Sequence, residues 1–369
     1  MNPVLAWLAG LLARLLRSVD WTLLLALLGL MAIGLATLHS AGNGSPRLAL
    51  TQGVYFAIGL GCMWLLSRVP LHILKQFTPA AFLASLVPLV IVLFVGSGKY
   101  GNHWIDLGLF SVQPSELAKL TLPMMLAWHL DRFRLPPDLR SFGIALGVIA
   151  LPVGLILLQK DFGTAMLVLA AGVFALYLAG LSWWWFAGAA AAAIPAGAVA
   201  WLYLLRPYQK DRILIFRHPE TDPMGAGWNI LQSKIAIGAG GLTGKGWGQG
   251  SQSHLDYLPE HTTDFVFSVL AEEFGWAGVV TVLLLYLVIV ARCLWIAADS
   301  RDGYARLLAG TLGLSLFVYV AVNAGMISGL LPVVGVPMPL LSRGGTSTIV
   351  LLAGLGVVMA LRAHRPVHR

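Results

Sequence analysis

The chain has 369 residues, of which 58% are hydrophobic and only 11% charged, and its mean hydropathy is +0.81. An ordinary soluble domain is about a quarter charged, so this composition excludes a soluble globular protein and a disordered chain. The formal net charge is +8, and the apolar segments recur from end to end, which predicts an all-α polytopic membrane protein.

About 20 apolar residues cross a bilayer as one helix, and the sequence contains about ten such segments. Before them, Met1–Val19 is a weaker amphipathic stretch that we expect to lie on the cytoplasmic surface. The predicted spans are, in chain order, Trp21–Ala41, Leu48–Leu66, Phe77–Gly96, Ser115–Leu130, Phe142–Leu158, Gly163–Gly180, Trp183–Leu205, Phe265–Ala297, Arg306–Leu331 and Thr346–Leu361.

The distribution of basic residues predicts the orientation. An even number of spans places both termini on one side of the membrane. If that side is the cytoplasm, most arginines fall inside, and the short outer loops carry one basic residue each: Arg47, Lys99, Lys160 and Arg343. The positive-inside rule therefore predicts cytoplasmic termini. No basic stripe interleaves with aromatic residues, so nucleic-acid binding is not indicated.

One connection differs from the others. Arg206–Thr263, between the seventh and eighth spans, is much longer than the rest and is rich in glycine. It contains too many large apolar residues for a disordered segment. We expect this extracytoplasmic loop to pack on the outer membrane face, partly as short interfacial helices, so that residues 1–369 form a single transmembrane domain.

The fourth span begins with a charged motif. Ser115 is expected to cap the helix, with Glu116 in its first turn. Glu116 and Lys119 are three residues apart, so they share a helix face and can pair. Two interpretations stay open: a structural ion pair that closes the bundle, or a functional pair that faces a cavity.

Other polar residues gather on the predicted outer side. Asp161 precedes Gly163 and Thr164 in a short connection, where it either caps the sixth span or lies at the rim of a polar site. In the long loop, the basic side chains either form a solvated surface or hold phosphates. These loop residues are Lys210, Arg212 and Lys234.

Asp264 stands where the long loop becomes the eighth span. An acid at this position is either a helix cap, favoured by the helix dipole, or a general base that faces a lipid-borne substrate. Further on, Asn323–Ser347 is rich in proline and glycine, which predicts a non-helical re-entrant segment. Such backbone is tolerated at membrane depth only against protein or a wet cavity.

Several motifs follow one another along the chain in a specific order. They are Gln113-Pro114-Ser115-Glu116 with Lys119, Asp161-Phe162-Gly163-Thr164, Pro207-Tyr208-Gln209-Lys210-Asp211-Arg212, Gln232-Ser233-Lys234, Leu258-Pro259-Glu260 with Thr263-Asp264-Phe265, and Gly344-Gly345-Thr346-Ser347. In this order and spacing they make the chain similar to the SEDS family (shape, elongation, division and sporulation) from about residue 20 to 362. The run Leu330–Pro337 resembles the RodA branch of that family.

This resemblance implies a ten-helix fold in the bacterial cytoplasmic membrane. It also implies a peptidoglycan glycosyltransferase that polymerises lipid II during cell elongation, with a class B penicillin-binding protein as its transpeptidase partner. Asp264 corresponds to the catalytic acid of the family. We assign the remaining candidates to substrate binding: Trp104, Glu116, Lys119, Asp161, Lys210, Arg212 and Lys234.

The expected mechanism has two parts. Asp264 takes the proton of the acceptor hydroxyl, and cations among Lys119, Lys210, Arg212 and Lys234 stabilise the diphosphate leaving group. A divalent cation, Mg²⁺ or Mn²⁺, could help, although no all-protein metal cage is visible.

The motifs depart from the family at two positions. Thr262 stands where the family has histidine, with His261 one place earlier, and Arg343 replaces an aromatic residue. Two other functions stay open. A lipid flippase or transporter would want related halves and charges near the membrane midplane. A non-catalytic scaffold would only activate the transpeptidase.

Overall fold

The computed structural model describes residues 18–97, 103–106, 108, 111–133, 135–204, 210, 214–222, 225–251 and 262–363. Nearly all of the amphipathic stretch predicted at residues 1–19 lies outside these residues, as do Arg212 and His261.

A helix occupies each predicted span. Eight helices of the described chain are long and apolar enough to cross a membrane. The remaining two predicted spans correspond to α7, which is shorter, and α5, whose 18 residues include three charged side chains. The helices in the spans are α2 (Trp21–Ala41), α3 (Pro46–Leu66), α4 (Leu71–Val95), α5 (Pro114–Asp131), α6 (Leu139–Leu158), α7 (Phe162–Leu178), α8 (Trp183–Val199), α12 (Val266–Asp299), α13 (Gly303–Ile327) and α14 (Thr346–Ala363).

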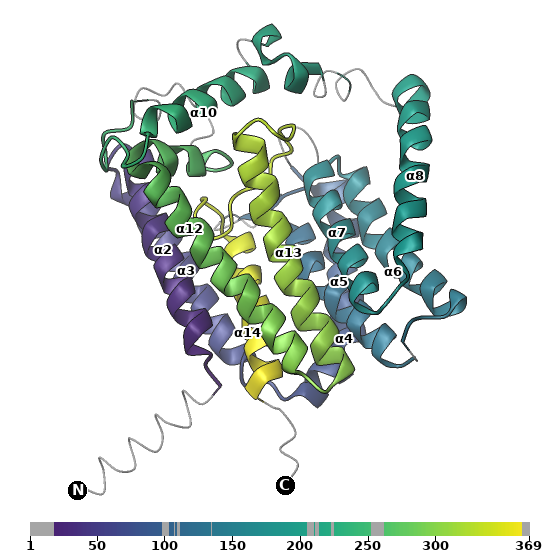
Figure 1. Ribbon diagram of the computed structural model, residues 1–369. Helices are drawn as coiled ribbons and strands as arrows, with labels where there is room; N and C mark the ends of the chain where they lie inside the picture. Colours follow the sequence, from purple (N-terminus) through teal and green to yellow (C-terminus); the bar gives the residue numbers. More distant parts are fainter. Residues whose placement is uncertain are drawn as a thin grey trace, which may run out of the picture.

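The helices form one bundle around α13 (Figure 1). Helix α12 packs on both α13 and α2, and α14 packs on α3, while α4, α5, α6 and α7 form the other side. The start of α2 and the end of α14 lie at the same end of the bundle, and α10 (Ala226–Gly240) crosses the opposite end. Helix α8, extended by the short π-helix η1 (Ala200–Leu204), stands at the edge of the bundle, and none of the residues of α8 is buried.

Small residues allow α14 to approach α3 closely. A Cβ on Gly356 would lie 2.4 Å from the carbonyl oxygen of Met63, and a Cβ on Gly59 would lie 2.4 Å from a side-chain carbon of Leu352. Membrane helices associate through such contacts, because lipid offers no hydrophobic driving force between them. The glycines thus explain why α3 and α14 pair although they are far apart in sequence.

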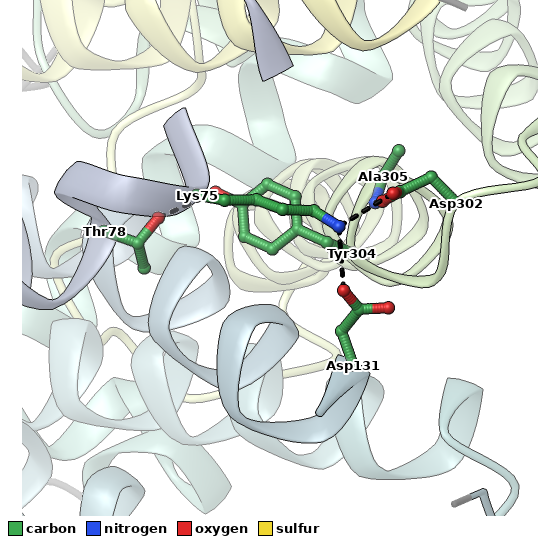
Figure 2. A network of polar contacts seen from close by, with 6 residues as sticks. All are labelled: Lys75, Thr78, Asp131, Asp302, Tyr304 and Ala305. Carbon is green, nitrogen blue, oxygen red and sulfur yellow. Dashed lines mark hydrogen bonds and ion pairs between the residues drawn. The ribbon is translucent and has the colours of Figure 1, made fainter. Parts of the chain in front are cut away.

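Ion pairs tie helices together at the end opposite α10. Lys75 of α4 contacts Asp131 of α5 at 2.9 Å and Asp302, the N-cap of α13, at 2.7 Å (Figure 2). In the same figure, the hydroxyls of Thr78 and Tyr304 are hydrogen-bonded at 2.9 Å. These contacts fix the ends of three helices against one another.

The eighth predicted span is not one continuous helix. Within α12, Gly275 has φ 63° and ψ −160°, a conformation that only glycine adopts readily. The break separates residues 266–274, here called the half-helix, from residues 276–299, which are long enough to cross the membrane alone. Hydropathy does not reveal this break, because glycine inside an apolar run leaves the run apolar.

Two irregular regions join these helices. The long connection contains α10 and the short 3₁₀ turn η2 (Pro219–Thr221), and thus includes the helical pieces expected there. Residues 328–345, between α13 and α14, are non-helical but bury Val336, Met338 and Leu341. This confirms the non-helical backbone predicted for most of Asn323–Ser347, although residues 323–327 belong to α13 and residues 346–347 to α14. A two-stranded ladder of β1 (Ile105–Asp106) and β2 (Ser111–Val112) precedes α5.

Candidate active site

Asp264 lies at the start of α12, half-buried against the segment 328–345. A Cβ built on Gly335, whose φ is 72°, would lie 3.6 Å from Oδ2 of Asp264. Asn323 of α13 donates from Nδ2 to the backbone oxygens of Asp264 (2.9 Å) and Val336 (2.7 Å). The N-cap residue of α12 is Phe265, so Asp264 does not occupy the capping position. Instead, its backbone oxygen is bonded to α13 and its side chain lies beside Gly335.

The two residues before Asp264 are fixed to the same segment. Ser342 donates its hydroxyl to the backbone oxygen of Thr263 (2.6 Å) and accepts from the N–H of Met338 (2.8 Å). The N–H of Arg343 donates to the oxygen of Thr262 (3.0 Å). Thr262 and Arg343 are the two positions at which the motifs differ from the family. Because the bond between them uses only main-chain atoms, it does not depend on their side chains.

The Glu116–Lys119 pair of α5 lies against the face of α13 that carries Tyr319. Lys119 Nζ is 2.6 Å from Glu116 Oε1, and only 12% and 7% of the two side chains is exposed. Lys119 Nζ also lies 4.6 Å from the ring centre of Tyr319. Tyr319 and Asn323 are four residues apart on α13, so they share a face. Tyr319, which Lys119 contacts, therefore lies about one helical turn, roughly 6 Å along the axis, further from the end of α13 than Asn323.

A pocket opens beside this pair. Its walls come from α5, α7, α13, α14 and the segment 328–345, and most of the lining residues are apolar. The polar lining residues are Glu116, Lys119, Ser315, Tyr319, Ser342, Ser347 and Thr348. Such a pocket can hold an apolar chain while presenting a few polar groups to it.

The start of α5 differs from the prediction. Gln113, not Ser115, is the N-cap residue, and Pro114 occupies the first helical position, which proline favours because it has no N–H to leave unpaired. Ser115 is buried one position further on. The prediction that Ser115 caps this helix was wrong.

Asp161 caps α7 as one interpretation predicted. Its carboxylate accepts from the N–H of Thr164 at 3.0 Å and from Nε2 of Gln113 at 2.9 Å. A Cβ on Gly163 would meet the carbonyl oxygen of Val334 at 2.4 Å, so the start of α7 packs directly on the segment that contacts Asp264. Gly163, two residues after Asp161, and the side chain of Asp264 thus both lie beside residues 334–335.

The basic residues and Trp104 are more dispersed. Lys234 of α10 is exposed, and its side chain lies over Gly329, where a Cβ would be 2.6 Å from Nζ. Ser233 Oγ donates to the oxygen of Ile327 (2.8 Å), which holds α10 on the end of α13. Lys210 lies 5.8 Å from the ring centre of Trp201, beyond α8. Trp104 pairs through its backbone with Ser97.

Comparison with known proteins decides the family. The sequence model of the FtsW/RodA/SpoVE family, described as "Cell cycle protein", matches residues 15–366. The chain belongs to this family. Peptidoglycan glycosyltransferase MrdB of Escherichia coli K12 is 43% identical over 348 residues, which is 94% of each chain. Peptidoglycan glycosyltransferase RodA of Treponema pallidum is 32% identical over 95% of this chain and 99% of its own.

Solved structures of the family agree in fold. A chain described under "structural coordination of polymerization and crosslinking by a peptidoglycan synthase complex" matches with a TM-score of 0.84 and 34% identity, over 95% of this chain and 99% of that one. RodA of Thermus thermophilus matches with a TM-score of 0.71 and 31% identity, over 94% and 97%. This member of the FtsW/RodA/SpoVE family is thus an all-α, multi-pass membrane protein.

Sequence reasoning missed Asn323, Tyr319 and Ser342 as parts of the site. Asn323 carried one usable signal, since a buried amide one turn before the end of an apolar helix needs hydrogen-bond partners. The partners themselves lie 59 and 13 residues away along the chain, and no local pattern reveals them.

Proposed function

We propose that Asp264 is the general base with which this chain, a peptidoglycan glycosyltransferase, joins lipid II units into glycan strands during cell elongation. The observation that carries the proposal is the placement of Asp264: Asn323 donates to its backbone oxygen, and its half-buried side chain lies beside Gly335 just before α12. A general base must be held within hydrogen-bond reach of the proton that it takes.

The reaction needs a proton acceptor and a stabilised leaving group. Asp264 accepts the proton of the acceptor 4-hydroxyl while that oxygen attacks the anomeric carbon of the donor. The bond from this carbon to undecaprenyl diphosphate breaks, and the diphosphate leaves with the electron pair. An α-linked donor gives a β-linked product by inversion. Lys234, whose side chain crosses the end of α13, is the described cation that we assign to the diphosphate.

The deeper pocket suits the lipid portion of the substrate. Its apolar lining can accept isoprenyl units, and Lys119, already paired with Glu116, supplies a charged group in its wall. We assign Lys119 to orientation of the substrate head group. Arg212 and Lys210 stay candidates for outer phosphate contacts, and Trp104 for contact with the sugar.

A divalent cation could also stabilise the negative charge of the leaving diphosphate. Among the described residues, no group of three or more histidines, cysteines or acids is arranged to hold a metal ion. Mg²⁺ often takes only one or two carboxylates and fills its shell with phosphate oxygens and water. We propose Asp264 and Asp161 as the nearest acids to such an ion. Loss of polymerisation in EDTA, restored by Mg²⁺ or Mn²⁺, tests this assignment.

The setting of the reaction follows from the same family. We propose that the protein lies in the bacterial cytoplasmic membrane with both termini in the cytoplasm, and that a class B penicillin-binding protein cross-links the strands it makes. The similar chain from a peptidoglycan synthase complex supports a transpeptidase partner.

The test is polymerisation of lipid II by purified protein carrying Asp264→Asn. Asparagine is nearly the same size, so the variant should insert, fold and bind its partner. It should lose polymer formation by at least about a hundredfold, the usual contribution of a general base. Asp264→Glu should recover little, because a shift of about 1 Å can cost about a hundredfold.

Asp256 and Glu260 provide controls, because they are acids of the loop that precedes Asp264, eight and four residues earlier respectively. Their neutral variants should keep measurable activity. Wild-type polymerisation by Asp264→Asn would remove this residue as the base. Absence of polymer from the purified wild-type protein, combined with lipid II transport across vesicles, would favour a flippase. Full function of Asp264→Asn in cells would favour a scaffold.

A further inference from the structure

The break in α12 leaves main-chain groups that need partners. At Gly275 the chain leaves helical geometry, so the carbonyls just before it and the N–H groups just after it lose their partners within the helix. Lipid provides no hydrogen bonds to replace them. The half-helix, residues 266–274, is joined to the rest of α12 only through this glycine.

Residues 241–251, the loop that follows α10, supply the missing partners. Two N–H groups of the loop donate to carbonyls of the half-helix, and two loop carbonyls accept from N–H groups after the break. These bonds are Lys245 N to Glu272 O (3.0 Å), Gly246 N to Glu273 O (3.0 Å), Trp276 N to Gly241 O (3.0 Å) and Ala277 N to Leu242 O (3.1 Å). The loop therefore bridges both sides of the break.

The fit between loop and break is close. A Cβ on Gly240 would lie 2.0 Å from the oxygen of Ala271, and a Cβ on Gly244 would lie 2.0 Å from the oxygen of Glu273. Because main-chain atoms of the loop 241–251 and of the half-helix are in direct contact, a movement of one requires a movement of the other.

Side chains reinforce this contact. Glu272 has a fully buried side chain, and its Oε1 lies 2.6 Å from Nζ of Lys245. The same oxygen accepts from the N–H of Ser251 at 2.9 Å and from its hydroxyl at 3.1 Å. The next residue, Glu273, accepts from the hydroxyl of Ser40 in α2. Trp247 donates from Nε1 to the oxygen of Ala36, so the loop is itself anchored on α2 (2.9 Å).

We propose that Lys245 and Glu272 are positioning residues that set the direction of the half-helix and thereby place Asp264. The inference rests on the proposed role of Asp264 as the base. Nine helical residues span about 13 Å, so a rotation of about 5° at Gly275 would move the far end by about 1 Å. A displacement of that size can change a rate by about a hundredfold. Asn323 contacts the chain just before the half-helix, at Asp264, and the Lys245–Glu272 pair fixes the other end of the half-helix, near Gly275.

The kinetic test uses Lys245→Met and Glu272→Gln in the full-length protein, with lipid II as substrate. We expect kcat to fall between about tenfold and a hundredfold with KM within about twofold, because the chemistry is misaligned while the substrate site is intact. Lys245→Arg, which keeps the charge, should restore most of the rate.

Lys75→Met is the matched control. Lys75 has the same exposure as Lys245, 30% against 31%, and likewise pairs with acids, but at the opposite end of the bundle. It should lower the melting temperature and leave kcat per folded molecule unchanged. If Lys75→Met and Lys245→Met lower kcat equally, the Lys245–Glu272 pair is only structural and the inference fails.

A distance measurement separates this inference from the proposed base. Spin labels on Thr262→Cys and Leu330→Cys, in a Cys62→Ser, Cys293→Ala background, report in nanodiscs the distance between the residues just before the half-helix and the residues just after α13. Lys245→Met should shift or broaden the distance distribution, and Lys75→Met should not. An unchanged distribution in Lys245→Met overturns the positioning role, whatever the activity. A shifted distribution with full activity upholds the positioning role and overturns Asp264 as the base.

Discussion

At the scale of single residues, the Glu116–Lys119 contact fits both interpretations of the sequence, a structural ion pair and a functional pair that faces a cavity. The charges are paired at 2.6 Å inside the bundle, as a structural ion pair should be, and both also line the pocket. A buried ion pair adds little net stability compared with apolar residues, but loss of one partner leaves an uncompensated charge. The pair can therefore be tested for each role separately.

Glu116→Gln and Lys119→Met should each destabilise the protein by about 3–5 kcal/mol, because each leaves the other charge buried alone. The double variant should regain much of that loss, and its melting temperature in detergent measures this. If the refolded double variant makes no polymer, Lys119 acts on the substrate as well as on Glu116. Wild-type behaviour of all three variants would rule out both roles.

Asn323 gives a second prediction at this scale. Asn323→Asp keeps the size of the side chain but replaces the NH₂ that donates to the oxygens of Asp264 and Val336. The loss of two buried hydrogen bonds should cost about 1–3 kcal/mol for each oxygen left unpaired. Polymerisation should fall more steeply than the fraction folded, measured by size-exclusion chromatography and lipid II assay on the same sample. A parallel fall would assign Asn323 to stability alone.

At the scale of helices, hydropathy located the spans because an apolar run of about 20 residues is a local signal. Helix α2 matches its predicted range, and α14 begins at the predicted Thr346. The break at Gly275 could not be predicted, since its partners come from a loop about 30 residues earlier. Likewise, Asp264 could be selected as an acid at a helix start, whereas its contacts with Asn323 and Gly335 depend on how α13 packs.

Two glycines of α14 test the close packing of this helix on α3. A Cβ on Gly356 would meet the backbone oxygen of Met63 at 2.4 Å, whereas a Cβ on Gly354 would meet a Leu120 methyl at 3.5 Å. Gly356→Ala should therefore destabilise by about 1–3 kcal/mol through overpacking. Gly354→Ala should be neutral or stabilise by up to about 1 kcal/mol through helix propensity. Thermal unfolding of the pair compares them directly, and equal melting temperatures would contradict the close approach.

At the scale of the whole molecule, the two ends of the bundle have different character. One end carries the ion pairs of Lys75 and Asp20, and α10 with the loop 241–251 covers the other. Asp264, Asp161 and Lys234 all lie toward the covered end. The fold therefore places these three candidate residues toward one end of the bundle.

The orientation of these ends gives a prediction for intact cells. In a Cys62→Ser, Cys293→Ala background, Leu242→Cys, at a position 74% exposed in the native structure, should react with a membrane-impermeant maleimide added outside the cytoplasmic membrane. Arg301→Cys, between α12 and α13, should react only after permeabilisation. The opposite labelling would invert the topology and place Asp264 away from the outer face.

Asp20 has a consequence for how the protein is made. It caps α2, the first described helix, and its carboxylate accepts from Arg292 at 3.0 Å and from Arg362, which lies 342 residues later in α14. At about 5–20 residues per second, translation needs roughly 17–70 s to travel from one to the other. Throughout that interval the nascent bundle holds a carboxylate without its second arginine and α3 without its partner helix. Completion of the C-terminal helix is therefore the event that closes the bundle, and a chain cut short before α14 should be recognised and degraded as unassembled.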